Sequence, residues 1–157
     1  MNTTRKGFTI IELLLAIGII GILITVIVPN LSNYRNEQAL TNTTEEIVSL
    51  LNKARNDTIS SLNYTNYSVH IESEKVVYFT GSTYNASDAT NISRVFESSV
   101  TIPSSGGINL NGGGSEVLFT RLTGDTTTYG TIIVRLTSNA ARQKTITILK
   151  TGAISSN

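Results

Sequence analysis

Residues 1–30 read MNTTRKGFTIIELLLAIGIIGILITVIVPN, and this stretch decides how the rest of the chain must be organised. Between Phe8 and Val28 the only charged residue is Glu12. At about 1.5 Å per residue, a helix over this stretch spans roughly 31 Å, which is about the thickness of the hydrocarbon core of a bilayer. The sequence therefore predicts a transmembrane helix over residues 8–29.

The charges on either side of this segment predict its orientation. Arg5 and Lys6 precede it, whereas Arg35 is the only basic residue soon after it. Basic residues flanking a span tend to stay in the cytoplasm, so we expect a cytoplasmic N-terminus and an external domain after Pro29. A cleavable secretory signal would have a shorter apolar region and a small-residue cleavage site, and neither is visible here.

Glu12 is the unusual residue of the segment. A carboxylate is costly inside a bilayer, and such residues are read by default as functional, with a partner to be identified. The alternative interpretation is a simple signal anchor in which Glu12 extends to the membrane interface. The segment alone leaves both interpretations open.

The leader ending in Lys6-Gly7, followed by FTIIEL at 8–13, resembles the class III signal of type IV prepilins and type II secretion pseudopilins. The resemblance implies that a prepilin peptidase removes residues 1–7 by cutting between Gly7 and Phe8, and methylates the new N-terminus at Phe8. It also implies that Glu12 pairs with the N-terminal amine of a neighbouring subunit and sets the assembly register. Such a pairing is physically reasonable, because opposite charges attract most strongly where the dielectric is low.

The segment after Pro29 is predicted to continue as an amphipathic helix over residues 30–63. Pro29 should bend the helix, because proline lacks an amide donor and clashes with the preceding turn. Apolar residues recur beyond it at helical spacing and need a cover. They are Leu40, Ile47, Leu50, Leu51, Ala54 and Leu62. The other face is predicted to be solvated, and its charged residues are Glu37, Glu45, Glu46, Lys53, Arg55 and Asp57.

Residues 64–157 are predicted to form a β-rich head that supplies this cover. Short runs of β-branched and aromatic residues alternate with turn-rich stretches, as in an antiparallel sheet. The predicted strands cover 67–71, 75–80, 94–97, 100–102, 116–122, 131–136 and 144–149. The stretches at 81–91 and 104–115 are rich in Gly, Ser, Asn and Thr and are predicted to be mobile surface loops. The expected fold class is therefore α+β, with a long N-terminal helix packed on an antiparallel sheet.

The order of these elements, together with the stretch from Glu116 to Asp125 and the late Thr151-Gly152, resembles the minor pilins and pseudopilins of the GspH/FimT group. The resemblance implies a structural subunit of a type IV pilus or a type II secretion pseudopilus. Its implied partners are the prepilin peptidase, other pilin-like subunits and the inner membrane. Its implied location is first that membrane and then a filament.

No pattern for catalysis is recognisable. The chain has no Cys and a single histidine, His70, and it contains no G-x-S-x-G, phosphate-binding loop or H-E-x-x-H motif. His70 lies in a strand-like run and is read as an ordinary histidine rather than a metal ligand. We therefore expect no enzymatic activity, no cofactor and no metal.

DNA binding is the alternative function. Residues 118–157 hold five Lys and Arg against one Asp, a local charge of +4, whereas residues 8–117 hold five basic and ten acidic residues, a charge of −5. A basic segment can guide DNA, and Arg142 and Lys144 are the candidate contacts. However, the tail after Gly152 lacks the arginine found in some DNA-uptake pilins. The competing interpretation is that these cations are dispersed over strand faces, and it is the one we favour.

Overall fold

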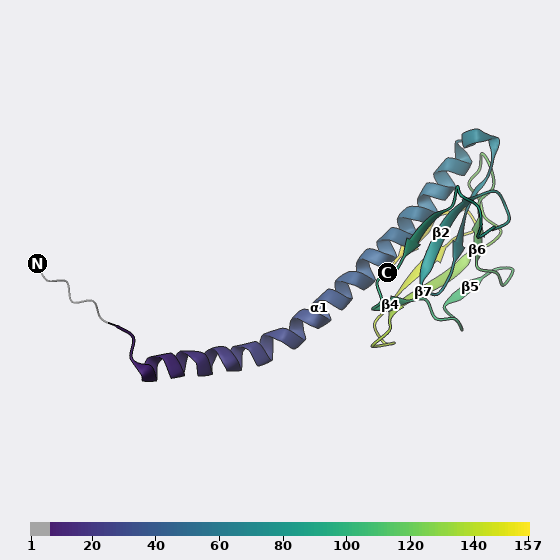
Figure 1. The fold of residues 1–157 in the computed structure, drawn as a ribbon. Helices are drawn as coiled ribbons and strands as arrows, with labels where there is room; N and C mark the ends of the chain where they lie inside the picture. The colour runs from purple at the N-terminus through teal and green to yellow at the C-terminus, as the bar shows by residue number, and fades with distance from the viewer. Residues whose placement is uncertain (1–6) are drawn as a thin grey trace, which may run out of the picture. The chain divides into compact units, whose positions relative to one another are not determined.

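The computed structural model describes residues 7–157, and it describes their side chains except those of residues 26–30. The chain divides into two compact units, Met1–Arg35 and Asn36–Asn157. The long helix α1 (Ile10–Ile59) begins in the first unit and ends in the second, where a short 3₁₀ helix η1 (Leu62–Tyr64) and the strands follow it (Figure 1). The prediction of a long helix followed by an antiparallel β head is confirmed.

The head contains two antiparallel sheets. The first has the strand order β3-β2-β1-β6. Its strands are β1 (Tyr67–Ile71), β2 (Lys75–Thr80), β3 (Ile92–Val95) and β6 (Glu116–Leu118). The second has the order β4-β7-β8-β9, and β5 also pairs with β7. Its strands are β4 (Val100–Thr101), β5 (Ile108–Leu110), β7 (Gly130–Leu136), β8 (Gln143–Ile148) and β9 (Ile154–Ser156).

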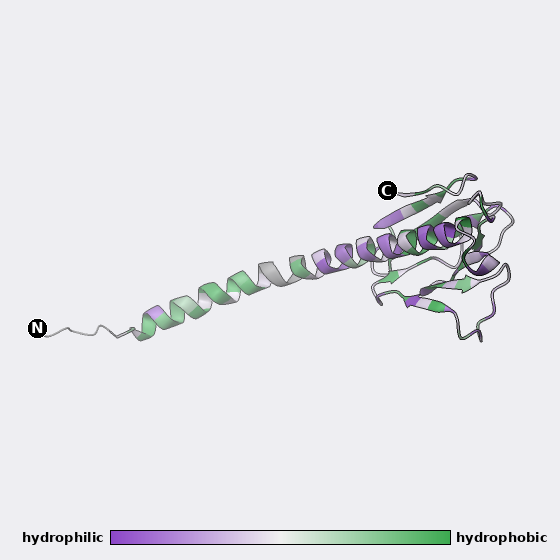
Figure 2. Cartoon of the chain, turned by 90° about the horizontal axis from the view of Figure 1, so that it is seen from above, coloured by the Kyte–Doolittle hydropathy of each residue, from purple (hydrophilic) through white to green (hydrophobic). Residues whose placement is uncertain are grey.

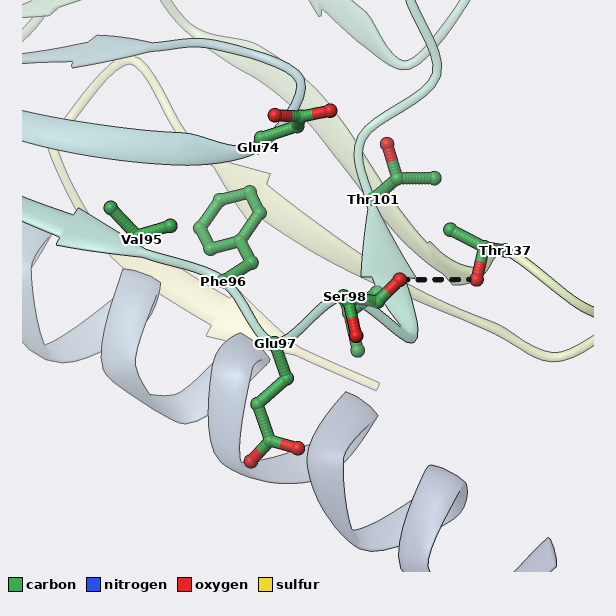
Figure 3. Close-up of a pocket in the computed structure, with 8 residues that line it drawn as sticks. Glu74, Val95, Phe96, Glu97, Ser98, Thr101 and Thr137 are labelled. Carbon is green, nitrogen blue, oxygen red and sulfur yellow. Dashed lines mark hydrogen bonds between the residues drawn. The ribbon is translucent and has the colours of Figure 1, made fainter.

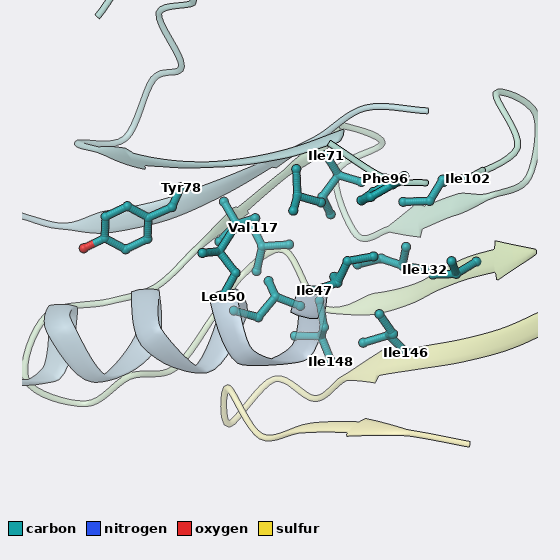
Figure 4. Packing of buried hydrophobic residues seen from close by; sticks show 14 of the residues in the cluster. Ile47, Leu50, Ile71, Tyr78, Phe96, Ile102, Val117, Ile132, Ile146 and Ile148 are labelled. Atoms are coloured by element: carbon teal, nitrogen blue, oxygen red, sulfur yellow. The ribbon is translucent and has the colours of Figure 1, made fainter. Parts of the chain in front are cut away.

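Side chains from α1 and from both sheets meet in one core (Figure 4). On the helix, Leu40, Ile47 and Leu51 are almost fully buried, as their helical spacing predicts. Alternate residues of the strands face them, because successive side chains of a strand point to opposite sides. These inward residues include Val69, Ile71, Val76, Val117, Ile132, Val134, Ile146 and Ile148. Each fully buried aliphatic side chain contributes about 1.5–3 kcal/mol, so this core stabilises the head.

The end of α1 differs from the predicted end at residue 63. The helix ends at Ile59, and Leu62, expected on the buried face, is 46% exposed. Ser61, Asn63 and Tyr64 have positive φ values, which turn the backbone out of the helical path. The side chain of Thr58 stabilises this turn, because its Oγ1 both accepts from the Tyr67 amide at 2.8 Å and donates to the Tyr67 carbonyl at 3.0 Å.

Two of the strands agree with the prediction in full, and others are shifted or shortened. β1 and β2 have the predicted bounds, whereas the strand expected at 94–97 lies two residues earlier as β3. The strand expected at 116–122 ends at Leu118, and the chain then turns through Leu122, whose φ is +69°.

Strands β5 and β9 were missed by the sequence analysis. The predicted loop 104–115 contains β5, which forms because Leu110 is buried in the core and pairs with Gly130. A Cβ atom on Gly130 would lie 2.0 Å from the carbonyl oxygen of Asn109, so this pairing requires glycine.

Among the described residues, none of the helices combines the length and the hydropathy needed for a membrane crossing. The transmembrane assignment of residues 8–29 is therefore not confirmed. Helix α1 includes Pro29, but its side chain and the predicted bend lie outside the described residues. The bend stays a prediction.

Candidate assembly site

The N-terminus of α1 is capped by Thr9. Its Oγ1 accepts a hydrogen bond of 3.3 Å from the backbone N–H of Glu12, and its carbonyl oxygen accepts one of 3.1 Å from the N–H of Leu13. The first amides of a helix have no partner within the helix, so a threonine cap of this kind stabilises its start. The sequence analysis missed this role of Thr9. The pattern T-x-x-E at 9–12, which is that of a capping box, could have revealed it.

Gly7 and Phe8 lie immediately before the cap, outside the helix. Phe8 is 87% exposed, and a Cβ atom at Gly7 would have no neighbour within 4 Å. The Gly7–Phe8 peptide bond is therefore accessible in an irregular segment, as a protease substrate must be. The preceding leader residues Arg5 and Lys6 lie outside the described residues.

Glu12 lies in the first turn of α1 and is exposed. A carboxylate there interacts favourably with the positive end of the helix dipole. Within the described residues, Glu12 has no ion-pair partner. Its charge is thus available to a cation supplied from outside the described part of the chain.

The first turns of α1 expose apolar side chains on every side, and Figure 2 shows this apolar part in green. Ile10, Ile11 and Leu13 point in different directions around the helix axis and are 79%, 72% and 57% exposed. The other exposed apolar side chains are Leu14, Leu15, Ile17, Ile19, Ile20, Ile22, Leu23 and Ile24. An exposed apolar surface of this kind is typical of a site that contacts another protein or a membrane.

Comparison with known proteins identifies the same segment. Residues 2–28 match the prokaryotic N-terminal methylation motif. This match includes Gly7, Phe8 and Glu12, and it supports a type IV pilin-like protein that is processed by a prepilin peptidase and assembles with other pilins. It does not confirm the GspH/FimT group. No curated protein and no solved structure matches the chain.

Of the two predicted DNA contacts, Arg142 directly precedes β8 and Lys144 lies within it. Arg142 Nε is 3.8 Å from Glu37 Oε2, and both side chains are largely exposed. Lys144 pairs in register with Val134, whereas the neighbouring cation Arg135 pairs with Gln143. Because alternate residues of a strand face opposite sides, Arg135 and Lys144 point to opposite faces of the sheet. The structure does not bring these two cations together, and DNA contact stays a prediction.

Three side chains on the face of α1 predicted to be solvated make specific contacts instead. Asp57 Oδ2 accepts a hydrogen bond of 2.6 Å from Lys53 and one of 2.8 Å from the Tyr78 hydroxyl. Burial raises the pKa of Asp57, but the hydrogen bonds from Lys53 and Tyr78 outweigh it, so this pKa lies below its usual value. Burial, followed by the hydrogen bond to Asp57, raises the pKa of Tyr78. Arg55 reaches the turns at Gly124 and Thr151.

His70 lies on the outer face of the first sheet, where its ring stacks on Tyr84 with the centroids 4.0 Å apart. Nδ1 is 3.6 Å from Glu116 Oε1, and Nε2 is 3.8 Å from Glu72 Oε1. The carboxylates thus approach opposite nitrogens of the ring and do not converge on one point. Across the described part of the chain, no three His, Cys, Asp or Glu side chains are placed to hold a metal ion.

Proposed function

We propose that this chain is a structural pilin or pseudopilin subunit without catalytic activity, which assembles into a type IV pilus or a type II secretion pseudopilus. The observation that carries the proposal is the methylation motif over residues 2–28, which includes the first turns of α1 with their exposed apolar side chains on all sides. The motif supports processing and assembly, and the apolar surface supports burial among lipids or neighbouring helices.

The residues of this segment then have distinct roles. The peptidase cuts after Gly7 and methylates the new amine of Phe8. Until assembly, the apolar helix anchors the subunit in the inner membrane with its N-terminus in the cytoplasm and its head outside. During assembly, the carboxylate of Glu12 pairs with the N-terminal amine of a neighbour, because an unpaired charge is costly in an apolar environment.

Within this class, we place the chain among the minor subunits of the GspH/FimT group. The support is the order of the elements, in which the helix is followed by antiparallel strands and by a late glycine turn at Gly152. The second candidate, a minor pilin for DNA uptake, draws on the charge of +4 over residues 118–157. It is less favoured because Arg142 faces Glu37.

The mature N-terminus tests the proposal. The full chain is expressed with and without a prepilin peptidase, and its intact mass is measured. We expect loss of residues 1–7 and one added methyl group only when the enzyme is present. Gly7→Leu, which fills the position beside the scissile bond, should remain uncut at an equal membrane level. A mature chain that begins elsewhere than Phe8 would overturn the assignment.

A further inference from the structure

Strand β3 (Ile92–Val95) forms an open edge of the first sheet. Among the described strands it pairs only with β2. All four of its residues are exposed, and the side chain of Val95 adds an apolar surface because it is 72% exposed. An open edge of this kind can bind the extended backbone of another chain, which then adds a strand to the sheet.

The pairing register shows which backbone groups of β3 are available. The N–H of Phe96, one residue beyond the strand, donates to the Glu74 carbonyl at 2.8 Å. In an antiparallel pair, positions bonded to the partner strand alternate with positions whose backbone groups point away from it. Arg94 is therefore bonded to β2, whereas the N–H and C=O groups of Ser93 and Val95 point outward. Among the described residues, only the Ser93 carbonyl of these groups has a partner, the Arg94 side chain at 3.3 Å.

The opposite edge of the same sheet is closed, which makes the open edge at β3 distinctive. At the β6 edge, Leu118 N–H donates to Thr128 Oγ1 at 2.9 Å, and the Leu118 carbonyl accepts a hydrogen bond of 2.6 Å from Thr126 Oγ1. Proteins commonly protect an exposed edge by covering it or by placing a charged side chain along it. The charged side chain of β3, Arg94, instead extends to Glu46 on α1, with Nε 3.2 Å from Oε1.

The open edge continues into a groove of about 320 Å³ where the chain passes from β3 to β4. Phe96 and Val100, both buried, form its apolar floor. The carboxylates of Glu74 and Glu97 lie on opposite sides of Phe96 (Figure 3). Val95 also lines the groove, so a segment that extends along β3 would pass into it.

The charge of the groove indicates the chemistry of that segment. Within the described residues, neither Glu74 nor Glu97 forms an ion pair. An extended segment that carries both basic and apolar residues fits this surface. A cation would meet the carboxylates, and an apolar side chain would cover Val95.

The other edge strands of this chain do not have this chemistry. No Lys or Arg lies in β4, β5, β6 or β9, and the cation of β3, Arg94, already pairs with Glu46. A minor subunit is also flanked in a filament by other subunits rather than by its own copies. The segment therefore comes from a different chain.

We propose that β3 pairs, through the outward backbone groups of Ser93 and Val95, with an extended segment of a different pilin-like subunit. The segment carries Lys or Arg toward Glu74 and Glu97. This inference deepens the proposed function and rests on it, since it names the surface by which the head binds a neighbouring subunit.

Hydrogen exchange measured by NMR on the full chain in detergent tests the strand addition. The probe is a short peptide of alternating valine and lysine with blocked ends. At saturating peptide, the amides of Ser93 and Val95 should exchange about three- to tenfold more slowly, as expected for one added hydrogen bond each. The amide of Arg94, already bonded to β2, should change little. A peptide of alternating valine and glutamate should protect neither, and unchanged exchange at Ser93 and Val95 would overturn the proposal.

A proline variant tests the backbone contribution. Ser93→Pro removes an outward N–H, and proline is tolerated on an edge strand where its nitrogen faces solvent. The peptide should then no longer protect the Val95 amide, whereas Ser93→Thr, which keeps the N–H, should retain the protection. Slow exchange of the Arg94 amide without peptide shows that the sheet is intact. Protection of Val95 that persists in Ser93→Pro would contradict pairing at this edge.

Neutral variants test the contribution of the carboxylates. Glu74→Gln combined with Glu97→Gln should weaken binding of the valine–lysine peptide about two- to fivefold, as expected for exposed ion pairs. Glu45→Gln combined with Asp125→Asn removes the same charge from exposed positions outside the groove and is the matched control. Equal affinities of the two double variants would show that the groove does not select a basic segment.

A photo-reactive residue in place of Val95 tests the contact during assembly. The full chain is expressed with its peptidase and the other subunits of its system, irradiated, and the cross-linked peptides are identified by mass. We expect a cross-link to a different pilin-like subunit, within a segment that contains Lys or Arg. The same substitution at Ser156, on the edge strand β9, is the control and should not cross-link to that segment. Cross-links from Val95 only to copies of this chain would overturn the proposal.

A third position separates this inference from the proposed function. Ile17 lies on the exposed apolar part of α1, and a photo-reactive residue there reports on contacts between helices. If Ile17 cross-links to other subunits while Val95 does not, the edge contact is wrong and the filament assignment stands. If neither position cross-links to another subunit in processed chains, the filament assignment is wrong as well.

Discussion

Arg55 Nε donates a hydrogen bond of 3.2 Å to the carbonyl oxygen of Gly124, and its Nη2 reaches the carbonyl of Thr151 at 3.4 Å. One arginine of α1 therefore holds two turns of the head. The turns approach closely, because a Cβ atom on Gly152 would lie 1.9 Å from the Gly124 oxygen and 2.7 Å from Arg55 Nε. Gly152 also has a φ of +74°, which favours glycine.

Gly152→Ala should destabilise the head more than the same change at a glycine in open space. Gly112 is the matched control, because its φ is +93° and a Cβ atom there would have no neighbour within 4 Å. Gly112→Ala should lower the free energy of unfolding by only about 1–2 kcal/mol, which is the cost of holding a residue with a side chain in a left-handed backbone conformation. Gly152→Ala adds a backbone clash. Denaturant unfolding of the full chain in detergent measures both, and equal losses would show that the close approach does not matter.

Glu12→Val should separate membrane insertion from assembly. Removing a charge from an apolar segment favours insertion, by about 2.5–3.5 kcal/mol at the centre of a span and less toward its ends. The same change removes the partner of the neighbouring amine and should reduce recovery in sheared filaments. The comparison requires equal membrane levels. Equal recovery of Glu12→Val and wild type would exclude an assembly role for this carboxylate.

Stability should fall at high pH because of Tyr78. Its pKa is raised in the folded head by burial and then by the hydrogen bond to Asp57, so folding favours the protonated hydroxyl. This contribution is fully present below the unfolded value of about 10 and is lost as the pH rises above it. Tyr78→Phe should make unfolding less sensitive to pH in that range. An unchanged slope would refute this account.

Asp57 should make stability depend on pH in the opposite direction, so that stability falls as the pH falls. Burial alone would raise its pKa, but the hydrogen bonds from Lys53 and Tyr78 lower it overall, so folding favours the carboxylate. This contribution is present above the unfolded value of about 3.9 and is lost as the pH falls through the lower folded value. Asp57→Asn should therefore flatten the acid limb of the stability profile, measured by circular dichroism between about pH 5 and pH 2.

DNA binding should be weak and easily abolished by salt. Arg142 faces Glu37, and Arg135 and Lys144 point to opposite faces of the second sheet, so few phosphates can be neutralised together. On duplex DNA, the logarithm of the binding constant falls linearly with the logarithm of the salt concentration, with a slope of roughly −0.9 per phosphate contact. Fluorescence anisotropy of the full chain measures it. Binding that survives about 0.15 M salt and is lost in the double variant Arg142→Glu, Lys144→Glu would restore the DNA-uptake alternative.

The sequence by itself determined the features that depend on neighbouring residues. Gly7, Phe8 and Glu12 lie in one continuous segment, and that segment matches the N-terminal methylation motif. The buried face of α1 follows from helical periodicity, and the bounds of β1 and β2 follow from short runs of β-branched and aromatic residues. In each case the physical cause acts within a few residues along the chain.

Only the tertiary structure decided the features that depend on distant residues. Arg55 looked like part of a solvated helical face, yet its partners Gly124 and Thr151 lie 69 and 96 positions away. Strand β5 has a loop-like composition and forms because β7 offers it a pairing edge at Gly130. Helix α1 ends at Ile59 rather than at 63, and Thr58 stabilises the turn that follows through its hydrogen bonds with the backbone of Tyr67. A hydrogen bond or a strand partner supplied from far along the chain leaves no local periodicity, so these positions were settled by packing in three dimensions.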